Sequence, residues 1–428
     1  MASIRKRNNT YQITVSNGRD VQGKQQIKTK TWKPDPRKSN HQNRKELEAF
    51  AFRFEQAVRE GSYLEGETIT FQMFAQLWLE QHAAYHLRIT TRNAYEYTIQ
   101  NYLIPAFGSY KLTKLQPLSI QIFYNQLRHA KRKDGKQGTL SSSSIRKIHN
   151  ILSSMLSTAV QWQLIESNPC RRISPPRQQK LNTENYFTLE QVQLFLELLD
   201  KPYFTTCPSH NRINETGKSY PVSEYQAHHT IPLQQKLFFY MALFGGFRRG
   251  ELLALTWDDI DFAEKSVSIT KSTISYKGKQ MEDLTKNYSS MRVVTLPDSI
   301  MTMLKNYQIE QKQYKVSIGN QWIGKNYLFI QWNGKQMNLS TPYHAFKKII
   351  KNYNDSVKDE SKKLPDIPLH GLRHTSATLL ISQNVDVKTV SNRLGHAQTS
   401  TTMNIYAHSL KKMDEKAADT LEQLIQRR

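Results

Sequence analysis

The stretch Leu369–Ile381, LHGLRHTSATLLI, has the spacing of an amphipathic helix in the C-terminal part of the chain. His370 and Arg373 lie one turn apart on one face of such a helix, while Ala377 and Leu380 continue its packed side. A histidine and an arginine placed in this way can point at the same anionic oxygen. The stretch therefore predicts a packed helix that offers an anion-binding pair.

A zinc site built on His370, His374 and His396 is disfavoured by the residues around them. A metalloprotease-like helix needs a glutamate beside the first of two histidines spaced i, i+4, and Gly371 follows His370 here. Arg373 would also repel a metal ion. We expect no metal and no cofactor.

Three further stretches carry side chains that suit phosphate chemistry. In FGGFRRGELLALTWDDID, residues 244–261, Glu251 follows Arg248 at helical spacing and can hold its guanidinium in one rotamer, although a surface ion pair has the same pattern. In LTKNYSSMRVVTLP, residues 284–297, a strand, a turn and a strand are expected, with Lys286 at the mouth of the turn.

The stretch LGHAQTSTTMNIYAH, residues 394–408, places Tyr406 ten residues after His396. The reference pKa of a tyrosine is about 10, so cations gathered for a phosphate would lower the cost of forming its phenolate. Attack on a phosphodiester asks for neutralised phosphate oxygens, an in-line nucleophile and a proton donor for the leaving oxygen. The four stretches together supply these groups without a metal ion or ATP.

The composition favours nucleic acid as the partner of this site. The chain has 60 Lys and Arg against 36 Asp and Glu, a net charge of +24, and a surface this basic collects phosphate contacts. No run of about 18 apolar residues and no signal peptide is apparent, so we expect no membrane. The two cysteines, Cys170 and Cys207, are typical of a reducing compartment and exclude a disulfide scaffold.

The chain is expected to be multidomain and mainly α-helical with small antiparallel β-sheets, an α+β architecture. The expected parts are a β-rich unit at 1–40, a linker helix at 41–66, a helical domain at 67–178 and a mixed domain at 185–428 that begins at a capping box, Thr188 to Gln191. In the helical domain, one helix is expected to stop at Pro105. In the mixed domain, Ser266–Thr273, the residues around Leu284 and Arg292–Leu296 are expected to form one small sheet, and residues 203–230 an insertion or long surface loop.

Two groups of side chains outside the mixed domain are candidates for contact with DNA. The first lies on the strands of the N-terminal unit, where a solvated edge strand is the alternative reading, and the second begins a long helix after a basic loop. The candidates are Arg5, Lys6, Arg7, Tyr11, Lys28, Lys30, Trp32, Arg146 and Lys147.

These motifs resemble the Arg–Lys–His-x-x-Arg–His–Tyr set of the tyrosine recombinases, the phage integrase family. The matching residues are Arg248 in GFRRGE, Lys286, His370 and Arg373 in HGLR, His396 in LGH, and Tyr406. Lys277 and Lys279 lie close enough to Lys286 to be confused with it. The resemblance covers nearly the whole chain, and its domain plan is that of integrases of temperate phages or conjugative elements.

The resemblance implies an arm-type DNA-binding unit, a SAM-like core-binding domain and a catalytic domain of the DNA breaking-rejoining type. Arg248 and Arg373 would hold the scissile phosphate, Lys286 would act as general acid, and His370 and His396 would assist proton movement. Tyr406 would form a 3′-phosphotyrosyl link, and Glu251 matches the acidic support residue. The tail after residue 408 would dock on a neighbouring protomer or pack on its own domain, through Leu410, Met413, Ala417, Leu421 and Leu424.

The implied function is integration, with excision, of a mobile element or prophage in the cytoplasm of a bacterial host. The implied partners are double-stranded DNA at core and arm sites, three further protomers of a homotetramer, a DNA-bending accessory protein and a directionality factor. Two alternatives stay open at this point: a type IB topoisomerase, and a DNA-binding regulator or architectural protein without catalysis.

Overall fold

In the computed structural model, the chain forms two compact units, Met1–Lys180 and Leu181–Arg428. The structure describes residues 2–19, 22–59, 69–133, 135, 137–177, 185–215, 217–276, 278–284, 291–396, 398–399, 402–403, 422 and 425. Among these, no helix is both long and apolar enough to cross a membrane.

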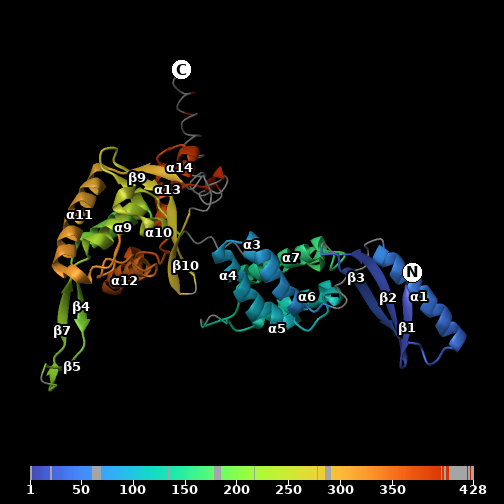
Figure 1. The fold of residues 1–428 in the computed structure, drawn as a ribbon. Helices are drawn as coiled ribbons and strands as arrows, with labels where there is room; N and C mark the ends of the chain where they lie inside the picture. The colour runs from blue at the N-terminus through green and yellow to red at the C-terminus, as the bar shows by residue number, and fades with distance from the viewer. Residues whose placement is uncertain are drawn as a thin grey trace. The chain divides into compact units, whose positions relative to one another are not determined.

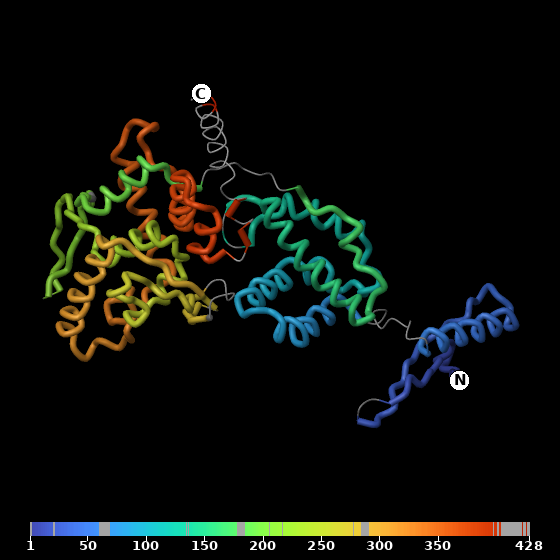
Figure 2. The backbone as a smooth tube through the Cα atoms, turned by 90° about the horizontal axis from the view of Figure 1, so that it is seen from above, coloured from blue at the N-terminus to red at the C-terminus, as the bar shows by residue number. Residues whose placement is uncertain are grey.

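The first unit begins with a three-stranded antiparallel sheet and one helix. The strands are β1 (Ser3–Arg7), β2 (Thr10–Arg19) and β3 (Gln25–Trp32), and the helix is α1 (Asn40–Arg59). Ile13 and Val15 of β2 are buried in one cluster with Leu47, Phe54 and Val58 of α1. The alternating sequence predicts this sheet correctly, whereas α1, expected as a linker, lies over the sheet and closes its core (Figures 1 and 2).

Helices dominate the rest of the first unit. They are α2 (Phe71–Trp78), α3 (Ala84–His86), α4 (Ile89–Thr98), α5 (Ile104–Phe107), α6 (Pro117–His129) and α7 (Ser142–Gln161). The expected stop at Pro105 is wrong, because a π-helical turn, Ile99–Leu103, joins α4 directly to α5. Pro105 is the second residue of α5, which directly follows the π-helical turn, so its missing N–H falls where the helical hydrogen-bond pattern already changes.

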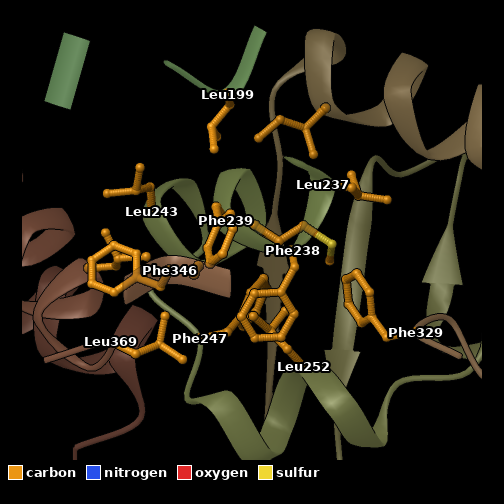
Figure 3. Packing of buried hydrophobic residues seen from close by; sticks show 14 of the residues in the cluster. Leu199, Leu237, Phe238, Phe239, Leu243, Phe247, Leu252, Phe329, Phe346 and Leu369 are labelled. Atoms are coloured by element: carbon orange, nitrogen blue, oxygen red, sulfur yellow. The ribbon is translucent and has the colours of Figure 1, made fainter. Parts of the chain in front are cut away.

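Most helices of the second unit pack around one large aromatic core. The helices of this unit are α8 (Leu189–Asp200), α9 (Leu233–Phe244), α10 (Arg249–Ala254), α11 (Asp298–Ile318), α12 (Thr341–Ser356), α13 (Gly371–Ser382) and α14 (Val387–Leu394). Phe195 meets Phe239 and Phe346 edge to face, at ring-centroid distances of 5.7 and 5.4 Å. Phe239 and Phe346 also lie side by side in this core (Figure 3). Leu252 of α10 and Leu372 of α13 belong to the same core, so these two helices are fixed relative to each other.

The described residues between 260 and 295 form two small sheets where one is expected. One sheet has the order β12 (Arg292–Thr295), β9 (Ser266–Ile269), β8 (Ile260–Asp261), and the other pairs β10 (Lys271–Tyr276) with β11 (Lys279–Leu284). The strands on either side of Lys286 therefore belong to different sheets. Alternation along a strand reveals its buried face but not its neighbour, so the sequence could not separate the two sheets.

Residues 203–229 form strands rather than the irregular loop that is expected. β4 (Tyr203–Cys207) pairs with β7 (Tyr225–His229), and β5 (His210–Ile213) pairs with β6 (Ser219–Val222). They project from the helices as a narrow ribbon (Figure 1). All of β5 and most of β6 are exposed, and a strand that faces solvent on both sides needs no alternation of apolar and polar residues.

Candidate active site

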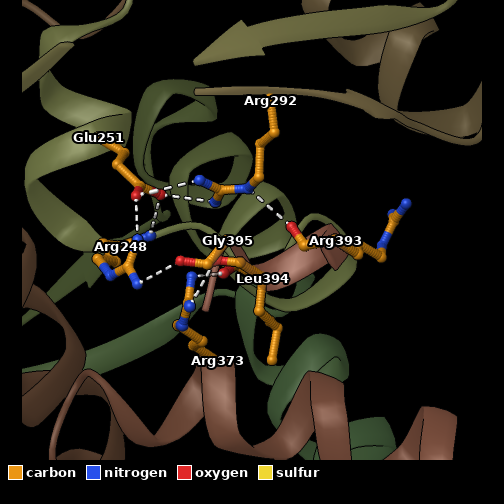
Figure 4. Close-up of polar contacts among 8 residues, drawn as sticks. Arg248, Glu251, Arg292, Arg373, Arg393, Leu394 and Gly395 are labelled. Atoms are coloured by element: carbon orange, nitrogen blue, oxygen red, sulfur yellow. Dashed lines mark hydrogen bonds and ion pairs between the residues drawn. The ribbon is translucent and has the colours of Figure 1, made fainter. Parts of the chain in front are cut away.

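Glu251 is a buried carboxylate that binds two arginines (Figure 4). Its side chain is only 2 % exposed. Oε1 accepts a hydrogen bond from Nη1 of Arg248 at 2.6 Å, and Oε2 accepts one from Nη2 of Arg292 at 2.7 Å. Oε2 also accepts the backbone N–H of Arg248 at 2.9 Å, which is half of a capping box at the start of α10. The expected contact between Arg248 and Glu251 is present, and the burial of Glu251 excludes a surface ion pair.

Two neighbouring carbonyls at the end of α14 hold the two arginines predicted to bind phosphate. Arg373 donates from Nη2 to the carbonyl of Leu394 at 2.6 Å and from Nη1 to that of Gly246 at 2.7 Å. Arg248 donates from Nη2 to the carbonyl of Gly395 at 3.0 Å. Arg248 and Arg373 are 125 residues apart in the sequence. Because the carbonyls that they bind belong to adjacent residues, the two arginines lie close together at this turn.

Gly395 is required by both its backbone and its surroundings. It ends α14 in the left-handed region, with a φ of +67°, which disfavours residues with a side chain. A Cβ added there would lie 2.9 Å from Nη1 of Arg292. The glycine of the LGH motif therefore allows Arg292 to approach the turn that leads to His396.

The two candidate histidines lie at the ends of helices in the same unit. His370 is the N-cap residue of α13, and its ring centroid is 4.8 Å from that of His374. His396 follows the turn after α14, and its Nδ1 is 2.9 Å from Oγ1 of Thr402. Because His374 packs edge to face against His370 and Thr402 forms a hydrogen bond with His396, each ring has a neighbour that limits its rotation.

Burial lowers the pKa of both His370 and His396 to about 4, and the charges of Arg373 and Arg248 act in the same direction. Both imidazoles are therefore neutral at pH 7, so each offers one N–H donor and one acceptor nitrogen. The charges of Arg373 and Arg248 act on both imidazole rings, so these four side chains share one electrostatic environment.

Burial alone would raise the pKa of Glu251, but the hydrogen bonds and charge of Arg292, followed by the charge of Arg248, outweigh it and hold that pKa below its usual value. Glu251 is therefore ionised at neutral pH. An ionised, buried carboxylate can fix Arg248 in one orientation before any phosphate arrives.

Arg292 is the member of this cluster that the sequence analysis missed. It begins β12, and only 6 % of its side chain is exposed. In the sequence, Arg292 marks only the start of an expected strand, because its partner Glu251 lies 41 residues away. A basic residue at the first position of a strand that is otherwise apolar is the one local signal.

Lys286 and Tyr406 lie outside the described residues, and so does the C-terminal stripe from Leu410 to Leu424. The roles assigned to them stay predictions. In the described part of the chain, no three His, Cys, Asp or Glu side chains gather in a way that could hold a metal ion.

The register of the N-terminal sheet divides the DNA-contact candidates between its two faces. Lys6 is opposite Tyr11, Tyr11 is opposite Trp32, and Lys30 is opposite the buried Ile13. Residues directly opposite each other share a face, so these side chains lie on the face that α1 covers, and Lys28, opposite the buried Val15, lies there too.

Arg5 and Arg7 alternate with Lys6 along β1 and therefore lie on the other face, together with Gln12. Both arginines are exposed. On α7, Lys147 is exposed and Arg146 is half-buried. The open face of the sheet thus carries Arg5 and Arg7 from the candidate set.

Two family models match the chain. The model of the phage integrase family matches residues 219–413, and that of the phage integrase N-terminal SAM-like domain matches residues 70–128. A tyrosine recombinase XerC-like protein of Caldanaerobacter subterraneus subsp. tengcongensis is 28 % identical over 97 % of this chain and 96 % of its own length. The ICEBs1 integrase of Bacillus subtilis is 24 % identical, and the match covers 98 % of each chain.

Solved structures show the same fold. The Tn1549 transposon integrase in complex with a circular intermediate DNA superposes with a TM-score of 0.61 at 18 % identity, over 82 % of this chain and all of that one. A lambda integrase dimer bound to a COC' core site gives a TM-score of 0.51 at 14 % identity, over 95 % of this chain and 94 % of that one. With the family matches over both units, these findings identify the chain as a member of the phage integrase family, a tyrosine site-specific recombinase that acts on DNA.

Proposed function

We propose that this recombinase integrates a mobile element or prophage into bacterial DNA, and excises it, through a covalent bond between Tyr406 and a 3′ phosphate. The observation that carries the proposal is the convergence of Arg248 and Arg373 on the adjacent carbonyls of Leu394 and Gly395. His396 follows these carbonyls directly, and Tyr406 follows ten residues later.

The proposed reaction divides the work between the basic side chains and the phenol. The Tyr406 oxygen attacks the phosphorus, its proton passes to the neutral imidazole of His370 or His396, and the bond from phosphorus to the 5′ oxygen breaks. Lys286 gives a proton to that departing 5′ oxygen, while Arg248 and Arg373 neutralise the phosphate oxygens. A 5′ hydroxyl from a second strand then reverses these steps, so the energy of the broken bond is kept and no ATP is needed.

The neutral state of His370 and His396 fits a role at the phosphate. A neutral imidazole donates one hydrogen bond to a phosphate oxygen and can accept a proton at its other nitrogen. A bound dianionic transition state would raise the pKa of both groups from about 4, because opposite charge favours the protonated form.

The two units supply two kinds of DNA surface in this proposal. Core-site DNA contacts the helical part of the first unit, including Lys147, and the catalytic unit. Arm-site DNA contacts the open face of the N-terminal sheet, through Arg5 and Arg7, which are exposed. Four protomers, a DNA-bending protein and a directionality factor complete the proposed assembly.

A suicide substrate tests the proposal. Purified protein is incubated with a nicked duplex that carries the element's core site, and covalent adducts are separated on a denaturing gel. We expect an adduct with the wild type and with a control, Tyr343→Phe, which alters a half-exposed tyrosine of α12, and no adduct with Tyr406→Phe.

The remaining outcomes decide between the functions. An adduct that persists in Tyr406→Phe refutes the proposed nucleophile. DNA binding without any adduct indicates a regulator, and relaxation of supercoiled DNA without strand exchange between paired sites indicates a topoisomerase. Cleavage that EDTA abolishes contradicts the metal-independent chemistry.

A further inference from the structure

Arg292 makes three kinds of contact at the centre of the site (Figure 4). Its Nη1 and Nη2 donate to Oε1 and Oε2 of Glu251 at 3.2 and 2.7 Å. Its Nε donates to the carbonyl of Arg393 at 2.7 Å. Its guanidinium carbon also lies 5.9 Å from the centre of the Phe247 ring. The two-pronged pairing with a carboxylate fixes the plane of the guanidinium as well as its position.

The carboxylate that Arg292 holds is the same one that holds Arg248. The Arg248 side chain is 36 % exposed, whereas that of Arg292 is 6 % exposed. Arg248 therefore reaches toward solvent, and Arg292 is the buried end of the chain of contacts. Without Arg292, Arg248 would be the one charged partner left to Glu251 among the described contacts. The carboxylate would then be oriented by a guanidinium on one side only.

Arg292 also contacts the turn that positions the other groups. It bonds the carbonyl of Arg393, and the next two carbonyls, of Leu394 and Gly395, hold Arg373 and Arg248. Three consecutive carbonyls of one turn thus bind three arginines. A shift of Arg292 moves both the carboxylate and the carbonyls on which Arg248 depends.

We infer that Arg292 is a positioning residue for cleavage, which acts through Glu251 and the 393–395 turn to hold Arg248 where the scissile phosphate binds. Because only 6 % of its side chain is exposed, Arg292 acts through these groups rather than through a contact with DNA of its own. The inference deepens the proposed function and rests on it. It assigns to a residue of β12 a role that none of the sequence motifs assigned.

Two substitutions and one control separate positioning from general stability. Arg292→Lys keeps the charge and loses the two-pronged geometry, and Arg292→Met also loses the charge. Lys236→Met is the matched control, since it removes a cation whose ion pair with Asp200, at 2.9 Å, lies outside the site. Each variant is checked for folding by circular dichroism and for core-site binding by gel shift before its cleavage rate is measured.

We expect Arg292→Lys to cleave the suicide substrate about 10²-fold more slowly than the wild type, because a small misplacement of a catalytic group has that scale of effect. Arg292→Met is expected to be slower still. Core-site binding stays unchanged in both, and Lys236→Met cleaves at the wild-type rate.

The pH profile gives a readout that loss of folded protein would not move. The charged groups facing Glu251 are Arg248, Arg292 and, in its protonated form, His370. Without Arg292, Glu251 takes up a proton at higher pH, so the acid limb of the cleavage rate moves to higher pH in Arg292→Met. In a Glu251→Gln background, whose residual cleavage rate is measured first, the same substitution adds little further loss.

The outcomes distinguish this inference from the function on which it rests. If the wild type forms no adduct, or Tyr406→Phe forms one, the proposed function fails. If the wild type cleaves as expected and both Arg292 variants cleave at its rate and with its pH profile, only the role of Arg292 is refuted. Failure of both variants to fold would also overturn it, in favour of a purely structural role.

Discussion

Replacing Gly395 with alanine tests how tightly the turn after α14 is packed against Arg292. The substitution forces an alanine into a φ of +67°, which costs about 1–2 kcal/mol for a residue with a Cβ. The new Cβ would also lie 2.9 Å from Nη1 and 3.3 Å from Cδ of Arg292, closer than van der Waals contact allows.

Arg292 cannot retreat without loss, because it is bonded to Glu251 on one side and to the carbonyl of Arg393 on the other. Giving up one hydrogen bond to a charged group costs about 1.5–3 kcal/mol. The two contributions sum to about 2.5–5 kcal/mol of lost unfolding free energy. Because the displaced turn also carries the carbonyl that holds Arg248, we expect cleavage to slow by about 10²-fold as well.

Gly278 provides the matched control for the backbone contribution. It has a φ of +77°, and no atom lies within 4 Å of the position its Cβ would take. Gly278→Ala should therefore show only the backbone cost, about 1–2 kcal/mol. Urea unfolding of both variants gives the two free energies, and equal losses for Gly395→Ala and Gly278→Ala would refute the packing argument.

Three further predictions concern charge. Replacing both Arg5 and Arg7 by alanine should reduce the slope of log affinity against log salt concentration for arm-site DNA by about 2, since each phosphate contact contributes about 0.9. An unchanged slope would exclude the open face of the sheet as the DNA contact. NMR titration should give midpoints near 4 for His370 and His396, and midpoints near 6.5 would contradict their burial. Because folding lowers both pKa values, the two histidines leave stability unchanged above pH 6.5 and reduce it as the pH falls toward 4, where the unfolded chain binds protons more readily. The pKa of Glu251 is lowered in the folded state, so its contribution to the unfolding free energy is fully present above pH 4.5 and is lost as the pH falls through the folded pKa. Glu251→Gln should lower the unfolding free energy by about 3–5 kcal/mol at neutral pH. In urea titrations this variant should lack the acid-dependent loss of the wild type.

The helices of this protein could be predicted from its sequence because their evidence is local. Thr188 and Gln191 form both halves of the expected capping box, and Ser141 caps α7 by accepting the N–H of Ser144. Phe71 and Phe74 are fully buried at their helical spacing. Each of these features depends on residues within one or two turns, so no tertiary contact is needed to recognise it.

The sheets could be predicted only in part, because pairing and register are not local. The alternation in β2 predicts a strand, but the face on which Lys30 lies depends on its being opposite Ile13 rather than one residue away. A shift of one residue would move Lys28 and Lys30 to the open face. The same limit explains why β11 and β12 were expected in one sheet.

The site shows the same division between local and distant information. The spacing of three residues between Arg248 and Glu251 indicates that they pair, and the HGLR motif places His370 close to Arg373. What the spacing could not show is that the carboxylate is shared. Glu251 is buried, and a buried carboxylate must be paired to stay ionised. The half-exposed Arg248 alone does not provide enough paired charge, so Glu251 needs a second cationic partner.

The need of Glu251 for a second cationic partner explains why a third arginine lies in the site. A single ion pair between Glu251 and Arg248 would leave the carboxylate oxygens underpaired in a position that is 2 % exposed, and Arg248 would have to choose between Glu251 and a phosphate. Arg292 removes this conflict, because it keeps the carboxylate charged and fixed from the buried side. Arg248 can then face the substrate without Glu251 losing its charge. In the proposed reaction, a recombinase that must release and rebind DNA phosphates needs an arginine whose position does not depend on the phosphate, and we infer that the buried Arg292 contact provides it.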